Sequence, residues 1–295
     1  MSNPFARCVY LQWLLLALVV LIGAQQTAQS DTPDVSEPLK SAEQVYRQQG
    51  PEAALPVFEQ LRDSYQSSGD TDSESTAIRF IGEIYWRFGE FEKADSNLQL
   101  ALNMKRQSSD LLQQGKILNV LGLLSWDKGD YTAAKEYFSQ GTVIAQDLGD
   151  KKLAGAILNN LSLVNDEQGD YRTSLDQYRQ VLELYKDIDF PRGESDTLGN
   201  IGGVYLLLGR FAEALSYYEK ALEISKEQQM IPSMSQDHGD FAMCLLGLGQ
   251  TELALQHFDE AINRAGQAGM RQDVAYWQRG KATALVRSGK YDLAL

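Results

Sequence analysis

A glycine followed two residues later by an aromatic residue recurs every forty residues along this chain of 295 residues. The pairs are Gly89–Phe91, Gly129–Tyr131, Gly169–Tyr171, Gly209–Phe211 and Gly289–Tyr291, and in the one exception Thr251 follows Gly249. A small residue comes three residues after the aromatic position and a large apolar residue four residues later, as in Ala214 and Tyr218. A weaker copy is visible at Ala54 and Phe58. A fixed period of this length is typical of an array of identical structural units.

Each unit has the pattern of two antiparallel helices joined by a tight turn. Leu198, Ile201 and Tyr205 are spaced i, i+3 and i+7, which places them on one face of a helix. A second helical pattern follows each glycine, and glycine is favoured just after a helix because it adopts left-handed backbone conformation at little cost. The small residue lets the two helices approach closely, and the large residue one turn later fills the space beside it. Because one hairpin cannot bury both of its apolar faces, we expect successive units to stack into an all-α solenoid.

The units resemble the tetratricopeptide repeat, whose pattern is large-x2-Leu-Gly-x2-Tyr followed by Ala-x3-Phe. The best copy here comprises Leu198, Ile201, Gly202 and Tyr205, then Ala214 and Tyr218. The usual unit has 34 residues, so this one is similar to the longer variety of kinesin light chains, cell-polarity adaptors and bacterial signalling proteins. The resemblance implies a right-handed superhelical solenoid of antiparallel helix pairs, with the first helix of each unit lining a concave surface.

The repeat predicts the organisation of the chain. Residues 1–30 form a leader segment, and residues 31–70 form a linker with a degenerate first helix pair. The array then covers residues 71–295, in units 71–110, 111–150, 151–190, 191–230, 231–270 and an incomplete 271–295. Because Leu295 lies five residues into a second helix, we expect the intact protein to continue.

The leader segment has the order of a signal peptide. Its only charge is Arg7, an apolar run covers residues 9–24, and small and polar residues follow. Cleavage is expected after Ala24, Ala28 or Ser30, and the alternative is an uncleaved N-terminal anchor, although the run is short for a span of about 20 residues. Either interpretation predicts an exported protein in a periplasmic or other extracytoplasmic compartment.

The composition narrows the classes of partner and of chemistry. A net charge of −13 argues against nucleic acid, since phosphate binding needs clustered Lys and Arg. The two histidines, His238 and His257, belong to different helix columns and have no further ligands at metal-binding spacing, so no metal or cofactor is expected. Cys244 lies in an apolar helical run, as a small buried hydrophobic residue does. No catalytic constellation is present, so the segment is predicted not to be an enzyme.

Asparagines align in two adjacent columns when the units are superposed. Asn119 and Asn159 share one column with Arg79 and Arg279, and Asn160 and Asn200 fall in the next. Asparagine costs a helix about 0.6 kcal/mol relative to alanine, so helix stability does not explain it. The resemblance implies that these four amides grip the backbone of an extended peptide, with both arginines as charge contacts near the groove ends. The alternative is that the amides cap or bridge neighbouring helices within the solenoid.

Two functions follow from these observations. The first is a scaffold that binds a protein or peptide in its groove. The second is the extracytoplasmic sensor or regulatory region of a larger signalling enzyme, such as a histidine kinase, a nucleotide cyclase or a caspase-like protease. Fold alone does not decide between them.

Overall fold

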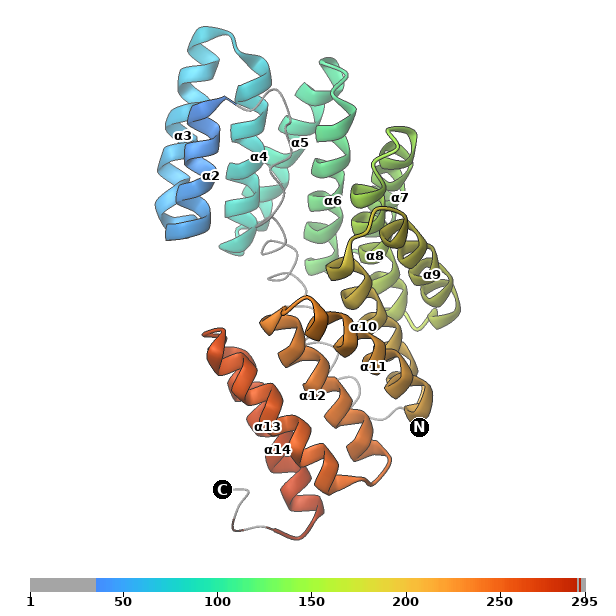
Figure 1. The fold of residues 1–295 in the computed structure, drawn as a ribbon. Helices are drawn as coiled ribbons and strands as arrows, with labels where there is room; N and C mark the ends of the chain where they lie inside the picture. Colours follow the sequence, from blue (N-terminus) through green and yellow to red (C-terminus); the bar gives the residue numbers. More distant parts are fainter. Residues whose placement is uncertain (1–35, 291, 293–295) are drawn as a thin grey trace. The chain divides into compact units, whose positions relative to one another are not determined.

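The computed structural model describes residues 36–290 and 292, which contain thirteen α-helices and no strand. The helices are α2 (Glu37–Gln49), α3 (Pro51–Ser68), α4 (Thr71–Arg87), α5 (Phe91–Gln107), α6 (Leu111–Asp127), α7 (Tyr131–Asp147), α8 (Lys151–Glu167), α9 (Tyr171–Asp187), α10 (Pro191–Leu207), α11 (Phe211–Glu227), α12 (Ile231–Gly247), α13 (Thr251–Gln267) and α14 (Arg271–Arg287). From α4 onward every helix has 17 residues, and Figure 1 shows them packed in sequence order. First helices of successive units are α4, α6, α8, α10, α12 and α14.

The recurring glycine ends each first helix and starts the turn, as at Gly129. Its backbone is left-handed, with φ of 77°, and its N–H donates to the carbonyl of Trp126 at 2.8 Å. The next residue, Asp130, begins the second helix, because its carboxylate accepts the N–H of Ala133 at 3.0 Å. The sequence Gly-Asp-aromatic therefore combines a helix stop, a helix start and a partly buried aromatic residue in three positions.

In the units that begin with α4, α6 and α10, the two helices meet where a glycine of the first helix faces a large residue of the second. A Cβ atom added to Gly122 would lie 2.5 Å from the ring of Phe138, and one added to Gly202 would lie 2.9 Å from Tyr218. Both rings are buried, so neither has room to move away. The large residues predicted from the sequence therefore pack directly over a column of small residues, which is glycine at Gly82, Gly122 and Gly202.

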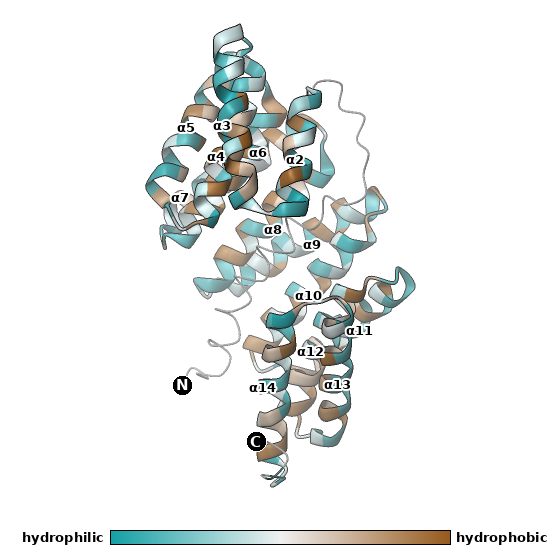
Figure 2. Ribbon diagram, turned by 90° about the vertical axis from the view of Figure 1, so that its left-hand side faces the viewer, coloured by the Kyte–Doolittle hydropathy of each residue, from teal (hydrophilic) through white to brown (hydrophobic). Residues whose placement is uncertain are grey.

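Successive units stack through their neighbours in the chain. Each second helix contacts the first helix of the next unit, and each first helix also contacts the next first helix. Figure 2 shows hydrophobic and hydrophilic residues mixed along each helix, as expected when one side faces a neighbour. The predicted all-α solenoid of antiparallel helix pairs is confirmed.

Two further sequence predictions concern the core and the chain end. Cys244 is fully buried, and burial raises the pKa of its thiol, so it behaves as a small core residue. The predicted signal peptide or anchor lies outside the described residues, as do Leu295 and its two predecessors. Among the helices that are described, none is both long and apolar enough to cross a membrane.

The contact between Gly122 and Phe138 predicts opposite effects of alanine at two helical glycines. Gly122→Ala should lower the free energy of unfolding by about 1–3 kcal/mol, because the added methyl group overlaps a ring that cannot move. Gly199→Ala is the matched control: its Cβ meets nothing within 4 Å, so helix propensity should raise stability by up to about 1 kcal/mol. Urea unfolding measures the free energy of unfolding of both variants. Equal changes in the two variants would contradict the close contact between Gly122 and Phe138.

Candidate functional site

The aligned asparagines lie on three consecutive first helices, α6, α8 and α10. Asn119, Asn159 and Asn200 are partly exposed, whereas Asn160 is fully buried. We call these four residues the amide ladder. The structure thus brings together all four asparagines that the sequence singled out.

The ladder consists of two hydrogen bonds between neighbouring first helices. The Nδ2 atom of Asn160 donates to Oδ1 of Asn119 at 2.9 Å, and Nδ2 of Asn200 donates to Oδ1 of Asn159 at 2.9 Å. Both bonds join residues that are 41 positions apart. The indole N–H of Trp86 donates to the carboxylate of Asp127 at 2.7 Å, and these residues are also 41 positions apart. A spacing of 41 residues therefore describes how successive first helices pack.

Hydrogen-bonding capacity remains on the three partly exposed amides. A side-chain amide has two N–H donors and an oxygen that accepts twice. Among the residues that the structure describes, the bonds above use only the oxygens of Asn119 and Asn159 and one donor of Asn200. Asn160 differs, because its remaining Oδ1 atom is buried without a partner. Asn160 therefore orients Asn119 from a buried position. The other three asparagines present unused hydrogen-bonding groups at the surface.

The two arginines of the first column have different surroundings. Arg79 forms an ion pair with Glu83 on its own helix, and its guanidinium lies 4.0 Å from the ring centre of Phe80. Arg279 is exposed on α14, with its guanidinium 5.8 Å from the ring centre of Tyr276. They occupy the same position in units at opposite ends of the array.

The amide columns change from α10 onward. Gly199 and Gly239 continue the first column without side chains, and Asp240 stands in the second column where an amide stood before. Asp240 is buried, and its burial raises the pKa of its carboxyl well above the ordinary range. The ladder accordingly ends at Asn200.

Two polar contacts near this end were not anticipated from the sequence. The hydroxyl of Ser225 donates to buried Asp237 at 2.5 Å, and burial raises the pKa of Asp237 to about 8. The rings of His238 and His257 meet with their Nδ1 atoms 3.1 Å apart, and burial lowers the pKa of His238 to about 4. Burial also lowers the pKa of His257. Across residues 36–290 no three potential ligands gather in a way that could hold a metal ion.

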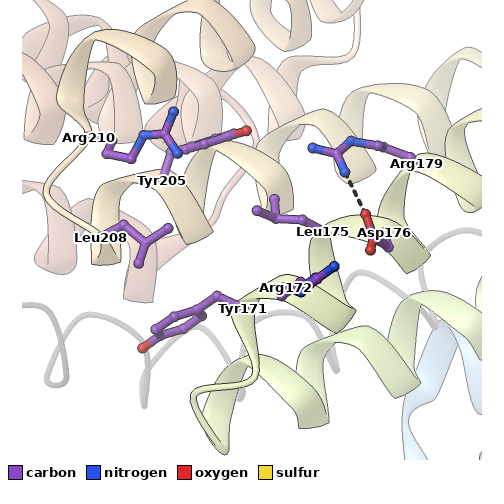
Figure 3. Close-up of a pocket in the computed structure, with 8 residues that line it drawn as sticks. All are labelled: Tyr171, Arg172, Leu175, Asp176, Arg179, Tyr205, Leu208 and Arg210. Atoms are coloured by element: carbon purple, nitrogen blue, oxygen red, sulfur yellow. Dashed lines mark hydrogen bonds and ion pairs between the residues drawn. The ribbon is translucent and has the colours of Figure 1, made fainter.

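A shallow hollow of about 520 Å³ lies between α9 and the turn from α10 to α11 (Figure 3). Its lining residues are Tyr171, Arg172, Leu175, Asp176, Arg179, Tyr205, Leu208 and Arg210. Arg179 pairs with Asp176 at 2.6 Å, and Arg210 pairs with Glu213 at 2.6 Å and lies over the ring of Tyr205. Sequence reasoning missed this surface, although the spacing of Arg172 and Arg179 on one helix face was a usable signal.

Comparison with known protein families agrees with the repeat pattern. Residues 113–187 match a family model described as tetratricopeptide repeat, and residues 195–227 match a second model with the same description. These stretches are tetratricopeptide repeats, as the sequence pattern predicted. No curated protein matches the chain.

Three solved structures illustrate the fold. The apo form of RapI is 16% identical, with a TM-score of 0.69, over 87% of this chain and 92% of that one. The Rap conjugation gene regulator of plasmid pLS20, in complex with the Phr* peptide, is 16% identical with a TM-score of 0.64, over 91% of this chain and 76% of that one. A Signal Transduction ATPase with Numerous Domains from Pyrococcus horikoshii, which has a tetratricopeptide repeat sensor, is 18% identical with a TM-score of 0.64. The match covers 97% of this chain but 44% of the ATPase.

The hydrogen bond between Asn159 and Asn200 should appear as a coupling energy. We expect the double variant Asn159→Ala/Asn200→Ala to differ from the sum of its single variants by about 0.5–1.5 kcal/mol in urea unfolding. The matched control cycle pairs Asn159→Ala with Asn119→Ala, two amides with no bond to each other, and should be additive within about 0.5 kcal/mol. Additivity in both cycles would rule out a stabilising amide pair.

The raised pKa of Asp237 predicts that stability falls with rising pH. The folded state keeps a proton on this carboxyl up to about pH 8, whereas the unfolded state loses it near the ordinary value of 3.8. The folded state therefore binds more protons across this window, and stability is lost as the pH rises through it. Asp237→Asn carries no such charge, so its advantage over the wild type should grow up to about pH 8 and then level off.

Thermal unfolding at about pH 6.5–9 tests this, because His238 is already neutral in the folded state there. The exposed substitution Asp147→Asn on α7 serves as the control and should run parallel to the wild type. A parallel course for Asp237→Asn as well would contradict the buried, protonated carboxyl.

Proposed function

We propose that this array is a protein-interaction scaffold that holds an extended peptide segment against α6, α8 and α10 through the amide ladder. The observation that carries the proposal is the row of partly exposed amides with unused hydrogen-bonding groups on consecutive first helices. Asparagine is a mediocre helix former, and hydrogen bonding between neighbours uses only part of what each amide offers.

The unused groups match a peptide backbone. Asn119 and Asn159 keep both Nδ2 donors, and Asn200 keeps its Oδ1 acceptor. A backbone presents an N–H and a C=O at nearly every residue, so it can satisfy donors and acceptors in the same row. Such binding fixes the path of a segment with little dependence on its side chains.

Mutual pairing prepares the amides for this role. A side chain already held by one hydrogen bond loses less freedom when a ligand binds, so less of the binding free energy is spent on ordering it. Asn160 acts as a positioning residue, since it is buried and contacts Asn119. The structural bridging considered as an alternative thus accompanies ligand binding, and Arg79 and Arg279 are proposed as charge contacts near the groove ends.

Structural neighbours support this class of function. The Rap regulator of pLS20 was solved with a peptide bound, and the Rap protein was solved with its Competence and Sporulation Factor. These proteins share the fold of this chain at 16% and 11% identity. The named ligands are those of the Rap proteins. For this chain, the two structures support only a peptide as the class of partner.

A second candidate role is the sensor region of a longer signalling protein. The match to the Pyrococcus horikoshii ATPase favours it, because a tetratricopeptide array is named there as the sensor of a larger protein. In that role, peptide capture would be the signal. The leader segment predicts that capture takes place on the exported side of a membrane. Sequencing the gene beyond codon 295 tests this: an effector domain supports it, and a stop after one further helix contradicts it.

The scaffold proposal predicts a loss of peptide binding on removal of the exposed amides. Asn119→Ala/Asn159→Ala/Asn200→Ala should weaken the capture of random nonapeptides, with capped ends, at least tenfold, since each lost bond is worth about 1 kcal/mol. The matched control replaces three asparagines of the second helices, Asn97, Asn103 and Asn263, and should bind as the wild type does. Fluorescence anisotropy measures capture, and circular dichroism checks that both triple variants stay helical. Equal binding by both triples would overturn the role of the ladder.

A further inference from the structure

Two charged residues flank the amide ladder at equivalent positions of their units. Lys116 lies three residues before Asn119 on α6, and Asp196 lies three residues before Gly199 on α10. The unit between them carries Ala156 at that position. Like the exposed amides, all three are partly exposed, so a positive and a negative charge stand two units apart on the same face.

Lys116 is a cation without a close counter-ion. Among the described residues its ammonium makes no ion pair within 4.0 Å, and Arg79 is the charged group that most opposes its positive charge. Burial first and Arg79 second lower the pKa of Lys116, so its charged form is disfavoured in the free protein. An anion placed beside Lys116 would attract the ammonium and so offset both effects.

Asp196 is an anion whose partner is distant. Its side chain is 39% exposed, and the one ion pair found for it within residues 36–290 is with Arg192, at 3.9 Å. That distance is about 1 Å longer than a charge-assisted hydrogen bond. A ligand cation could therefore form a closer contact than the protein provides.

From this arrangement, and resting on the proposed function, we infer that the bound segment carries opposite charges at its two ends, an acidic group at Lys116 and a basic group at Asp196. Charges complementary to Lys116 and Asp196 distinguish the proposed peptide from other extended segments. The negative field of a chain with net charge −13 attracts basic segments in general, so the requirement for an acidic group at Lys116 supplies the discrimination.

The length of such a segment follows from helix packing. Packed helices lie about 8–10 Å apart, so α6 and α10, with α8 between them, are about 20 Å apart along this face. An extended chain advances about 3.3 Å per residue, and about six residues therefore cover the distance.

The test uses four pools of peptides with neutral, mixed-sequence spacers of about six residues and capped ends. The terminal residues are Glu and Lys in the mixed pool, Glu and Glu in the acidic pool, Lys and Lys in the basic pool, and Gln and Gln in the neutral pool. The wild type should bind the mixed pool about tenfold more tightly than the neutral pool. Lys116→Glu should transfer the preference to the basic pool, and Asp196→Lys should transfer it to the acidic pool.

The double variant Lys116→Glu/Asp196→Lys should recover the preference for the mixed pool, with the peptides bound in the opposite direction. Lys151→Glu and Asp187→Lys make the same changes in net charge at an exposed ion pair elsewhere and should leave every preference unchanged. Equal binding of all four pools, still weakened by the triple amide variant, would overturn the charge inference and leave the scaffold standing. Failure of the wild type to bind any pool would overturn both.

Discussion

The close contact between a small residue of the first helix and a large side chain of the second is the constraint on which the other features depend. It sets how near the two helices come, as at Gly122 and Phe138, and any other register would place a backbone Cβ inside a ring. With helices of 17 residues and turns of three, the units from α4 onward then all have the same length. Units of the same length stack with one repeated offset, so equivalent side chains recur every forty residues on the same face of the array.

The offset between first helices is 41 residues, one more than the repeat, and this explains the adjacent asparagines of α8. A residue pairs with the neighbouring column of the next unit, so a helix in the middle of a ladder needs one amide facing each way. Asn159 accepts from Asn200 on one side, while Asn160 donates to Asn119 on the other. The same offset joins Trp126 to Glu167 at 2.5 Å.

Most of the fold could be predicted from the sequence, because the glycine period and the apolar columns are properties of a single unit. The amide pairing could not, since an offset of 41 arises only when two units are packed together. The contact between His238 and His257 was hidden for a related reason: it joins a first and a second helix whose columns are not adjacent in the repeat pattern. The hollow around Arg172 and Arg210 likewise combines residues of two units, and its arginines stand out only once those units are neighbours.

The amide ladder ends at Asn200 because the next pair of positions cannot form the same hydrogen bond. The next step of the register would join Gly199 to Asp240, but Gly199 has no side chain to accept a bond, and open space surrounds its Cα. Asp240 is buried, and its burial raises the pKa of its carboxyl, so it belongs to the interior and not to the exposed amides. The surface proposed to hold a peptide backbone therefore covers α6, α8 and α10. Asp196 lies at its last helix and Lys116 at its first, so the two charges bracket the ladder, as the ends of a single short ligand would require.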